Sequence, residues 1–467
     1  MSFLIVLAAL CFLMFVAYRG YSVILFAPIA ALGAVLLTDP SLVAPMFTGL
    51  FMDKMVGFLK LYFPVFLLGA VFGKLIEISG FSKAIVKATI AVVGAQRAML
   101  SIVLVCALLT YGGVSLFVVV FAVYPFAAEL FRQSDIPKRL IPGTIALGAF
   151  TFTMDALPGT PQIQNIIPAS FFGTTAWAAP VLGTLGGVFI LGVGLAYLEW
   201  RRRKALAAGE GYGDAATLVN EPASFAGGRL ANPLIAILPL VLVGVSNKLF
   251  TGLIPRFYGQ THEFVPAVIG TPAPVVQEVS KVAAIWAVEG ALLVGIATVL
   301  AFAWKPVIAS FAEGTKSAIG GALLASMNTA SEYGFGAVIA ALPGFLVVAN
   351  ALSAIPNPLV NEAVTVTALA GITGSASGGM SIALAAMAEP FIANANAAGI
   401  PMEVMHRVAA MASGGMDTLP HNGAVITLLA VTGLTHRQAY KDVFAITLVK
   451  TLAVFVVIGV FYATGWV

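Results

Sequence analysis

The chain has 467 residues, of which 60% are hydrophobic and only 9% charged, and its formal net charge is +4. A soluble domain of this size needs far more charge on its surface, so the composition excludes that class and predicts an all-α polytopic membrane protein. The positive charge is small and dispersed, which argues against a nucleic-acid partner. Cys11 and Cys106 lie in apolar segments, so we expect no structural disulfide.

Hydropathy predicts about ten membrane crossings in chain order. The N-terminal run has no basic region and no small-residue cleavage site, so residues 1–21 are interpreted as a retained first span. The predicted crossings are 3–17, 22–37, 55–79, 139–171, 177–199, 232–252, 283–303, 318–342, 402–434 and 442–464.

Two further apolar segments do not fit as spans. Residues 98–110 would form a helix about 20 Å long, which is short of the ~30 Å hydrocarbon core, and a glycine turn and a second apolar run follow. We predict re-entrant hairpins over 98–131 and 363–394, each turning at a glycine- and serine-rich tip. One long span with a glycine kink is the alternative for each segment.

The spans at 139–171 and 402–434 are predicted to be broken by a repeated motif. Residues 154–158 read MDALP and residues 416–420 read MDTLP, so Asp417 follows Asp155 by 262 residues. Helix-breaking residues and acidic side chains at membrane depth are tolerated only inside the protein or along a cavity. In a chain with two repeats they indicate the binding site of a transporter.

Other matches keep nearly the same offset, so the chain is predicted to contain two inverted repeats, 22–204 and 283–467. A linker at 205–230 follows the first repeat, and a connecting span with an outer loop occupies 231–282. The basic run 201–204 predicts a cytoplasmic linker and places both termini outside. Lys54, Arg256 and Lys281 count against this orientation.

The sequence GGMDTLPHNG at 414–423, followed by GLTH at 433–436, resembles the gluconate permease (GntP) family of the ion transporter superfamily, and its hydroxybutyrate permease-like members in particular. The resemblance covers nearly the whole chain and implies proton-coupled uptake of a small hydroxy-carboxylate across a bacterial inner membrane. It also implies a homodimer with an elevator mechanism, in which hairpins and broken helices form a transport domain that moves against a scaffold. The first half departs from gluconate carriers, because residues 155–161 and 111–115 lack their Pro/His-rich stretch and acidic hairpin tip. This departure favours an acid smaller than gluconate.

The tips and breaks together are predicted to form a cavity near the membrane midplane. Helix N-termini offer free N–H groups and partial positive charge to a carboxylate, and we expect them to bind the anion because no arginine is apparent near either break. The hydroxyls could instead be local helix caps. The candidate substrate-binding residues are Tyr111, Gly112, Gly113, Ser115, Thr160, Gln162, Asn165, Thr373, Gly374, Ser375, Ser377, Gly378, Gly379, His421 and Asn422.

Four ionisable residues are candidates for proton coupling: Asp155, Asp417, His421 and Glu332. A charged carboxylate at the bilayer centre costs ~2.5–3.5 kcal/mol on insertion scales, so these acids need a role. Capping the broken helices is the structural alternative for the aspartates, and donation to a carbonyl is the alternative for His421. Lys450, inside the last span, would either reach the membrane surface or pair with an acid.

Other classes of membrane protein would require different sequence features. An intramembrane aspartyl protease would need a Gly-x-Gly-Asp signature, but Met416 precedes Asp417, so no enzyme is predicted. An anion channel, sodium coupling, and a gluconate-like or other organic acid remain alternatives. No metal, nucleotide or redox signature is visible, so no cofactor is expected. The expected partners are a small carboxylate, a proton or sodium ion, the lipid bilayer and a second copy of the chain.

Overall fold

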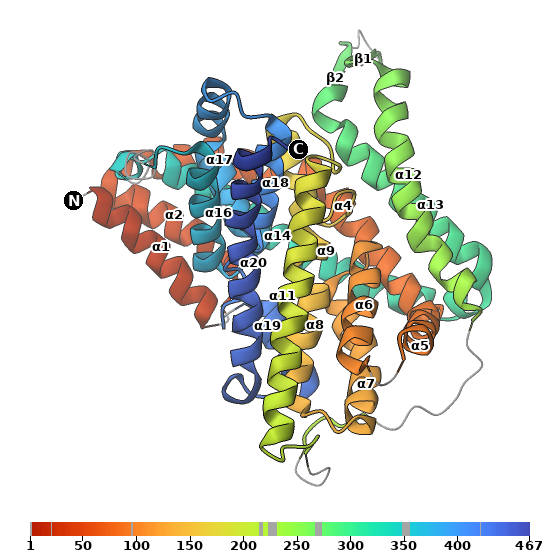
Figure 1. Cartoon of the computed structure of the whole chain (residues 1–467). Coiled ribbons are helices and arrows are strands. Elements are labelled where there is room, and N and C mark those ends of the chain that lie inside the picture. The colour runs from red at the N-terminus through yellow and green to blue at the C-terminus, as the bar shows by residue number, and fades with distance from the viewer. Residues whose placement is uncertain are drawn as a thin grey trace.

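A computed structural model describes residues 2–19, 21–94, 97–213, 218–222, 231–266, 273–347, 355–420 and 422–467. These residues are almost entirely helical, which confirms the predicted all-α class (Figure 1). His421 lies outside the described residues.

The first half runs from α1 to α11. Its helices are α1 (Ser2–Tyr18), α2 (Val23–Thr38), α3 (Val43–Met46), α4 (Met52–Ile78), α5 (Phe81–Val93), α6 (Ala98–Tyr111), α7 (Leu116–Gln133), α8 (Ile141–Ala149), α9 (Phe152–Asp155), α10 (Ile163–Phe172) and α11 (Pro180–Ala207). Short turns at Pro40–Leu42 and Phe47–Phe51 lead into α4, so this helical rod starts earlier than predicted.

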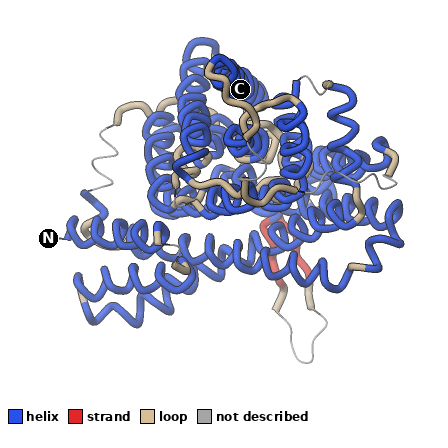
Figure 2. Tube along the Cα trace, turned by 90° about the horizontal axis from the view of Figure 1, so that it is seen from below, coloured by secondary structure: helices blue, strands red, loops and turns tan. Residues whose placement is uncertain are grey.

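The second half runs from α12 to α20. Its elements are α12 (Pro233–Tyr258), β1 (Thr261–Phe264), β2 (Val275–Glu278), α13 (Val279–Ala309), α14 (Phe311–Ala340), α16 (Pro358–Thr373), α17 (Ala376–Ala397), α18 (Met402–Ser413), α19 (Gly423–Thr432) and α20 (His436–Thr464). The sequence predicted only an outer loop around the two strands. They form an antiparallel ribbon at an edge of the molecule, next to the ends of α12 and α13 (Figures 1 and 2).

Local sequence explains where the helices begin and end. Proline occupies the first turn of α11, α12 and α16, where its missing N–H needs no partner. The broken helices end at Gly173 and Gly433, whose φ angles of 64° and 65° are left-handed and favour glycine. The same signal therefore ends the same element in both halves.

Among the described residues, six helical segments are long and apolar enough to cross a membrane: Pro40–Ile78, α11, α12, α13, α17 and α20. The crossings predicted at 3–17, 22–37 and 318–342 correspond to α1, α2 and α14, which are not among these six segments. α17 was predicted as a hairpin arm but is one of the six. Large apolar side chains face outward, with Leu234 78% and Val188 62% exposed, as expected for helices that contact lipid. The protein is therefore a multi-pass membrane protein.

Many contacts between helices occur twice, once for each half of the chain, between equivalent helices. α6 packs on α8 as α16 packs on α18, and α7 packs on α19 as α17 packs on α10. The pairs α1–α2 and α12–α13 match in the same way and lie on opposite sides of the molecule (Figure 1). The contacts thus indicate a repeat unit that includes α1 and α12. In each hairpin, the first arm packs on its own broken helix and the second arm packs on both broken helices.

Candidate functional site

The two breaks in the helices lie against each other. The first joins α8 to α10 through α9, and the second joins α18 to α19; α9 and α10 both pack on α18. The Asp155 carboxylate of the first break lies against Gly414 of the second, where a Cβ atom would collide with it. The repeated motifs therefore form one buried centre.

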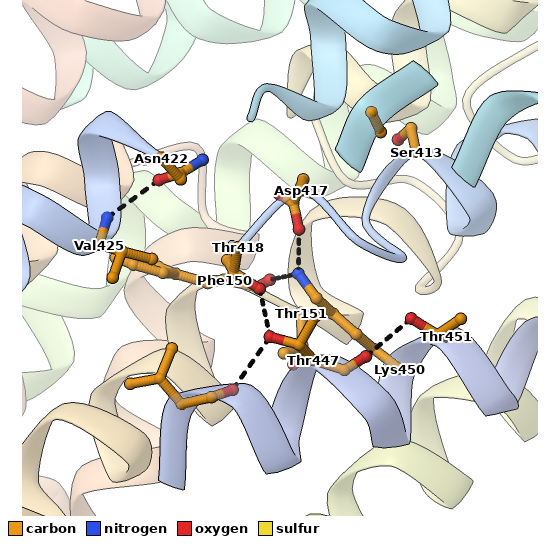
Figure 3. Close-up of polar contacts among 12 residues, drawn as sticks. Phe150, Thr151, Ser413, Asp417, Thr418, Asn422, Val425, Thr447, Lys450 and Thr451 are labelled. Carbon is orange, nitrogen blue, oxygen red and sulfur yellow. Dashed lines mark hydrogen bonds and ion pairs between the residues drawn. The ribbon is translucent and has the colours of Figure 1, made fainter. Parts of the chain in front are cut away.

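Lys450 of α20 connects the two breaks (Figure 3). Its side chain is 2% exposed, its Nζ donates to the Phe150 carbonyl at 3.1 Å, and it forms an ion pair with the Asp417 carboxylate. The sequence left open whether Lys450 reaches the membrane surface or pairs with an acid. In the fold it pairs with the aspartate of its own half and binds the backbone of the other.

α20 holds the second break at further points. Thr418 and Thr447 share a hydrogen bond of 2.6 Å between their hydroxyls, and the Tyr440 hydroxyl donates to the Thr418 carbonyl at 3.2 Å. His436 Nε2 lies 2.9 Å from the Pro420 carbonyl. The second break is thus fixed along its length by one helix.

Arg407 holds the first break, and the expectation that no arginine lies near a break is wrong. It is fully buried on α18 and donates to the Asp155 carbonyl at 3.0 Å, the Ala178 carbonyl at 2.7 Å and Asn165 Oδ1 at 2.9 Å. Arg407 precedes the second break by seven residues in sequence, but it reaches the first break across the repeat interface. No local pattern in the sequence predicts this contact, because it depends on the packing of α18 against α9 and α10.

Asn165 and His406 complete this interface. Asn165 Nδ2 donates to the carbonyls of Thr160 and Ala176, both at 2.9 Å, and its Oδ1 accepts from Arg407 and lies 3.3 Å from His406 Nε2. Because this oxygen accepts, His406 carries its proton on Nε2, and Nδ1 accepts from a threonine hydroxyl at 2.6 Å. The Asn165 amide is therefore occupied by protein partners.

The tip of the first hairpin, residues 112–115 between α6 and α7, is bound to the first break. Gln162 Nε2 donates to the carbonyls of Thr110 at 2.7 Å and Val114 at 3.3 Å. The Tyr111 hydroxyl donates to the Pro158 carbonyl at 2.8 Å. These bonds place the N-termini of α7 and α10 side by side.

Both of these helix N-termini lack a side-chain cap. Ser115 precedes α7 and Gln162 precedes α10, but neither side chain accepts from the first turn that follows. Thr110 Oγ1, near the end of α6, and Gln164 Oε1, in the first turn of α10, are buried without a hydrogen-bond partner among the described residues. Such an atom costs ~1–3 kcal/mol unless a ligand or water satisfies it. Thr110 and Gln164 were not among the predicted site residues, although they directly flank the predicted residues Tyr111 and Asn165.

The tip of the second hairpin, between α16 and α17, is closed by caps. Asn422 Nδ2 donates to the Gly374 carbonyl at 2.7 Å while its Oδ1 accepts from the Val425 N–H at 2.9 Å, which caps α19. Ser375 Oγ accepts from the Gly378 N–H at 3.1 Å, which caps α17. Here the predicted site residues satisfy the helix ends themselves.

The other predicted residues mostly contact protein. Thr160 Oγ1 donates to the Thr153 carbonyl at 2.8 Å, and Thr373 Oγ1 donates to the Leu369 carbonyl at 3.0 Å. The predicted tip glycines allow close packing, and their neighbours are Pro161 for Gly113, Leu240 for Gly112, Glu332 for Gly378 and Ala370 for Gly379. Tyr111 and Gly112 also line a mainly apolar cavity of about 510 Å³ beside α12.

A bundle of membrane helices around a buried centre of opposed breaks and paired charges defines a polytopic membrane transporter. No family model matches the chain. It is 60% identical over 475 residues to the uncharacterized transporter YxjC of Bacillus subtilis (strain 168), with the full length of both chains covered, and it belongs to the family of that transporter. The crystal structure of the YdaH transporter of Alcanivorax borkumensis aligns with a TM-score of 0.49 at 15% identity, over 92% of this chain and 90% of that one.

Proposed function

We propose that the protein is a symporter that imports a small hydroxy-monocarboxylate, such as 3-hydroxybutyrate, together with one proton. The observation that carries this proposal is the charge balance of the centre. Among the described residues it holds two carboxylates, Asp155 and Asp417, and two cations, Lys450 and Arg407. With all four groups ionised, the centre carries no net charge before a substrate binds.

A bound monocarboxylate would leave this centre with one net negative charge. A net charge in the membrane interior is costly. A centre that binds one anion and one proton therefore moves across the membrane more easily than a centre that binds the anion alone. Asp155 is the group we assign to the proton, because Asp417 has an ion pair with Lys450 and no ion pair to Asp155 is found in the described part of the chain. The proposal thus predicts electroneutral transport with one proton for each substrate.

The uncapped ends of α7 and α10 are the site we assign to the substrate carboxylate. Their first-turn N–H groups have no side-chain partner and carry the partial positive charge of the helix ends. Thr110 Oγ1 and Gln164 Oε1 supply polar partners for the substrate hydroxyl. The choice of a hydroxy-monocarboxylate itself rests on the resemblance to hydroxybutyrate permease-like proteins.

The test is uptake of labelled 3-hydroxybutyrate into proteoliposomes with an inward proton gradient and no sodium, at several imposed membrane potentials. We expect accumulation against the gradient that a protonophore abolishes, that the potential does not change, and that gluconate does not inhibit. Accumulation that sodium drives without a proton gradient would overturn the proton assignment, and inhibition by gluconate would move the substrate toward sugar acids. Uptake that stops at equilibrium would identify an anion channel.

The elevator mechanism implied by the resemblance gives a second test. In this mechanism α17 moves against α14, and the Thr329 and Ser377 hydroxyls, which lie 3.2 Å apart, would separate. In a chain without Cys11 and Cys106, the Thr329→Cys/Ser377→Cys variant should form a disulfide that stops transport until it is reduced. Each single cysteine variant is the control, and full transport by the oxidised pair would exclude movement at this contact.

A further inference from the structure

α14 and α17 meet along a face of small and polar residues. Thr329 Oγ1 lies 3.2 Å from Ser377 Oγ, Gly378 lies directly against the Glu332 carboxylate, and Gly336 lies against Ile382 of α17. The two glycines allow the helices to approach closely. Glu332 is therefore enclosed between a span and the second arm of a hairpin.

Two oxygen atoms in this contact have no hydrogen-bond partner among the described residues. Glu332 is 2% exposed and its Oε2 is buried and unsatisfied; Ser381 is fully buried and its Oγ is also unsatisfied. Ser381 follows Ser377 by one helical turn, so both hydroxyls lie on the side of α17 that faces α14. The contact thus gathers a carboxylate and three hydroxyls, from Thr329, Ser377 and Ser381.

Within the described part of the chain, no basic side chain forms an ion pair with the Glu332 carboxylate. The helices packed on α14 here are α2, α4 and α17, and no ion pair to Glu332 is found within the described ranges. α2 carries no ionisable residue, and Glu389 of α17 is exposed about three turns away. α4 carries Asp53, Lys54, Lys60, Lys74 and Glu77, and of these Asp53 and Lys54 line a cavity beside α14 together with Tyr62 and Tyr333. A buried carboxylate in these surroundings needs a positive charge from outside the chain.

We infer that Glu332, Thr329, Ser377 and Ser381 form a binding site for a monovalent cation, either a proton or sodium. One carboxylate matches one positive charge, and hydroxyl and carboxylate oxygens are suitable ligands for a small hard cation. The site is separate from the proton on Asp155 and depends on the proposed function only for the movement of the hairpin. When α17 leaves α14, the two α17 hydroxyls leave the site, so cation affinity changes with conformation.

The test measures cation binding in the absence of substrate, so it does not depend on whether the proposed substrate is correct. Thermal unfolding of the purified full chain would be followed in detergent at pH 5.5 and 8.5, in sodium chloride or choline chloride at equal ionic strength. The variants are Glu332→Gln and Ser381→Ala, and the matched control is Glu289→Gln on α13. Glutamine keeps the shape of Glu332 without its charge, so the variant should fold.

If the cation is sodium, sodium should raise the Tm of the wild type at pH 8.5, and both site variants should weaken the sodium midpoint at least about ten-fold. If it is a proton, the wild type should lose Tm from pH 5.5 to 8.5 equally in both salts, and Glu332→Gln should lose less. A Glu332→Gln variant whose Tm depends on pH and sodium as strongly as that of Glu289→Gln would overturn the site.

Discussion

The two breaks have nearly the same motif but bind their surroundings differently. In the second break, Asp417 is paired with Lys450; Ser375 caps α17 of the hairpin that precedes the break, and Asn422 caps α19, which follows it. In the first break, Asp155 has no ion pair among the described residues, and α7 and α10 have no side-chain caps. At the second copy of the motif, the carboxylate and the helix ends have side-chain partners. At the first copy they lack such partners among the described residues.

Part of this difference follows from single residues that the repeat does not share. The position equivalent to Lys450 in the first half, 262 residues earlier, is Val188, which is exposed on α11 and brings no cation to Asp155. Gln162 and Asn422 both donate to the tip of their own hairpin, but only the shorter Asn422 also caps its helix. The two halves therefore share the same arrangement of helices, and a few substitutions decide which half has an ion pair and side-chain caps among the described residues.

The largest effect should come from the paired aspartate. Lys450→Met leaves the Asp417 carboxylate buried without its cation and should destabilise the protein by about 3–5 kcal/mol. Adding Asp417→Asn should restore much of the loss, because no buried charge is then unmatched. Unfolding in detergent measures both, with Lys248→Met as the control. Equal losses for the single and double variants would show that the pair is not coupled.

Asp155→Asn should affect transport and leave stability nearly unchanged. With one proton per substrate, a gradient of two pH units supports about 100-fold accumulation, ten-fold for each unit. The variant should lose this accumulation and keep substrate counterflow, which needs no net proton movement. Accumulation at the wild-type level would show that Asp155 does not carry the coupled proton.

Substitutions of the two side-chain amides that bind the hairpin tips, Asn422 and Gln162, should separate an effect on stability from an effect on substrate affinity. Asn422→Ala removes a helix cap and a bond to the hairpin, so we expect a loss of about 1–3 kcal/mol in stability. Gln162→Ala removes only bonds to the first tip, so we expect a smaller loss of about 0.5–1.5 kcal/mol. Gln162→Ala should instead raise the KM for uptake, because it frees the tip beside the assigned substrate site. An unchanged KM would argue against that site.

The smallest effect should be a pH dependence from the linker strap, residues 218–222. Glu221 in this strap is paired with Lys138 at 2.7 Å and Arg132 at 2.5 Å, and the adjacent Asn220 donates to the Ala430 carbonyl of α19 at 2.8 Å. The strap therefore also fastens the helix that follows the second break.

Burial would raise the pKa of Glu221, but the bonds from Lys138 and Arg132 outweigh it and lower the pKa below the ordinary value of 4.5. A lowered pKa in the folded state means that the strap stabilises the protein above about pH 4.5 and loses this contribution as the pH falls. We expect a loss of about 1 kcal/mol on acidification, measured as Tm against pH. Glu221→Gln should flatten this dependence, and an equally steep curve would place the titration elsewhere.

Local chemistry made much of the fold predictable. Apolar runs too long or too numerous for a soluble protein determined the class, and the helix ends at Gly173 and Gly433 follow from glycine itself. The α6 and α16 helices end at the predicted glycine turns, and the helices at 141–172 and 402–432 are interrupted at the repeated motifs. The two strands were missed because a short exposed ribbon leaves no burial pattern in the sequence.

By itself, the sequence determined which residues interrupt the helices and that the interruption occurs twice. Only the tertiary structure decided what each polar group binds, because those partners come from helices far apart in the chain. Arg407 reaches across 252 residues to the Asp155 carbonyl, and Lys450 reaches across 300 to the Phe150 carbonyl. A repeat predicts equal roles for equal residues, but the free energy of a buried charge depends on its neighbours. Those neighbours make Asp417 half of an ion pair and leave Asp155 as the candidate carrier of the proton.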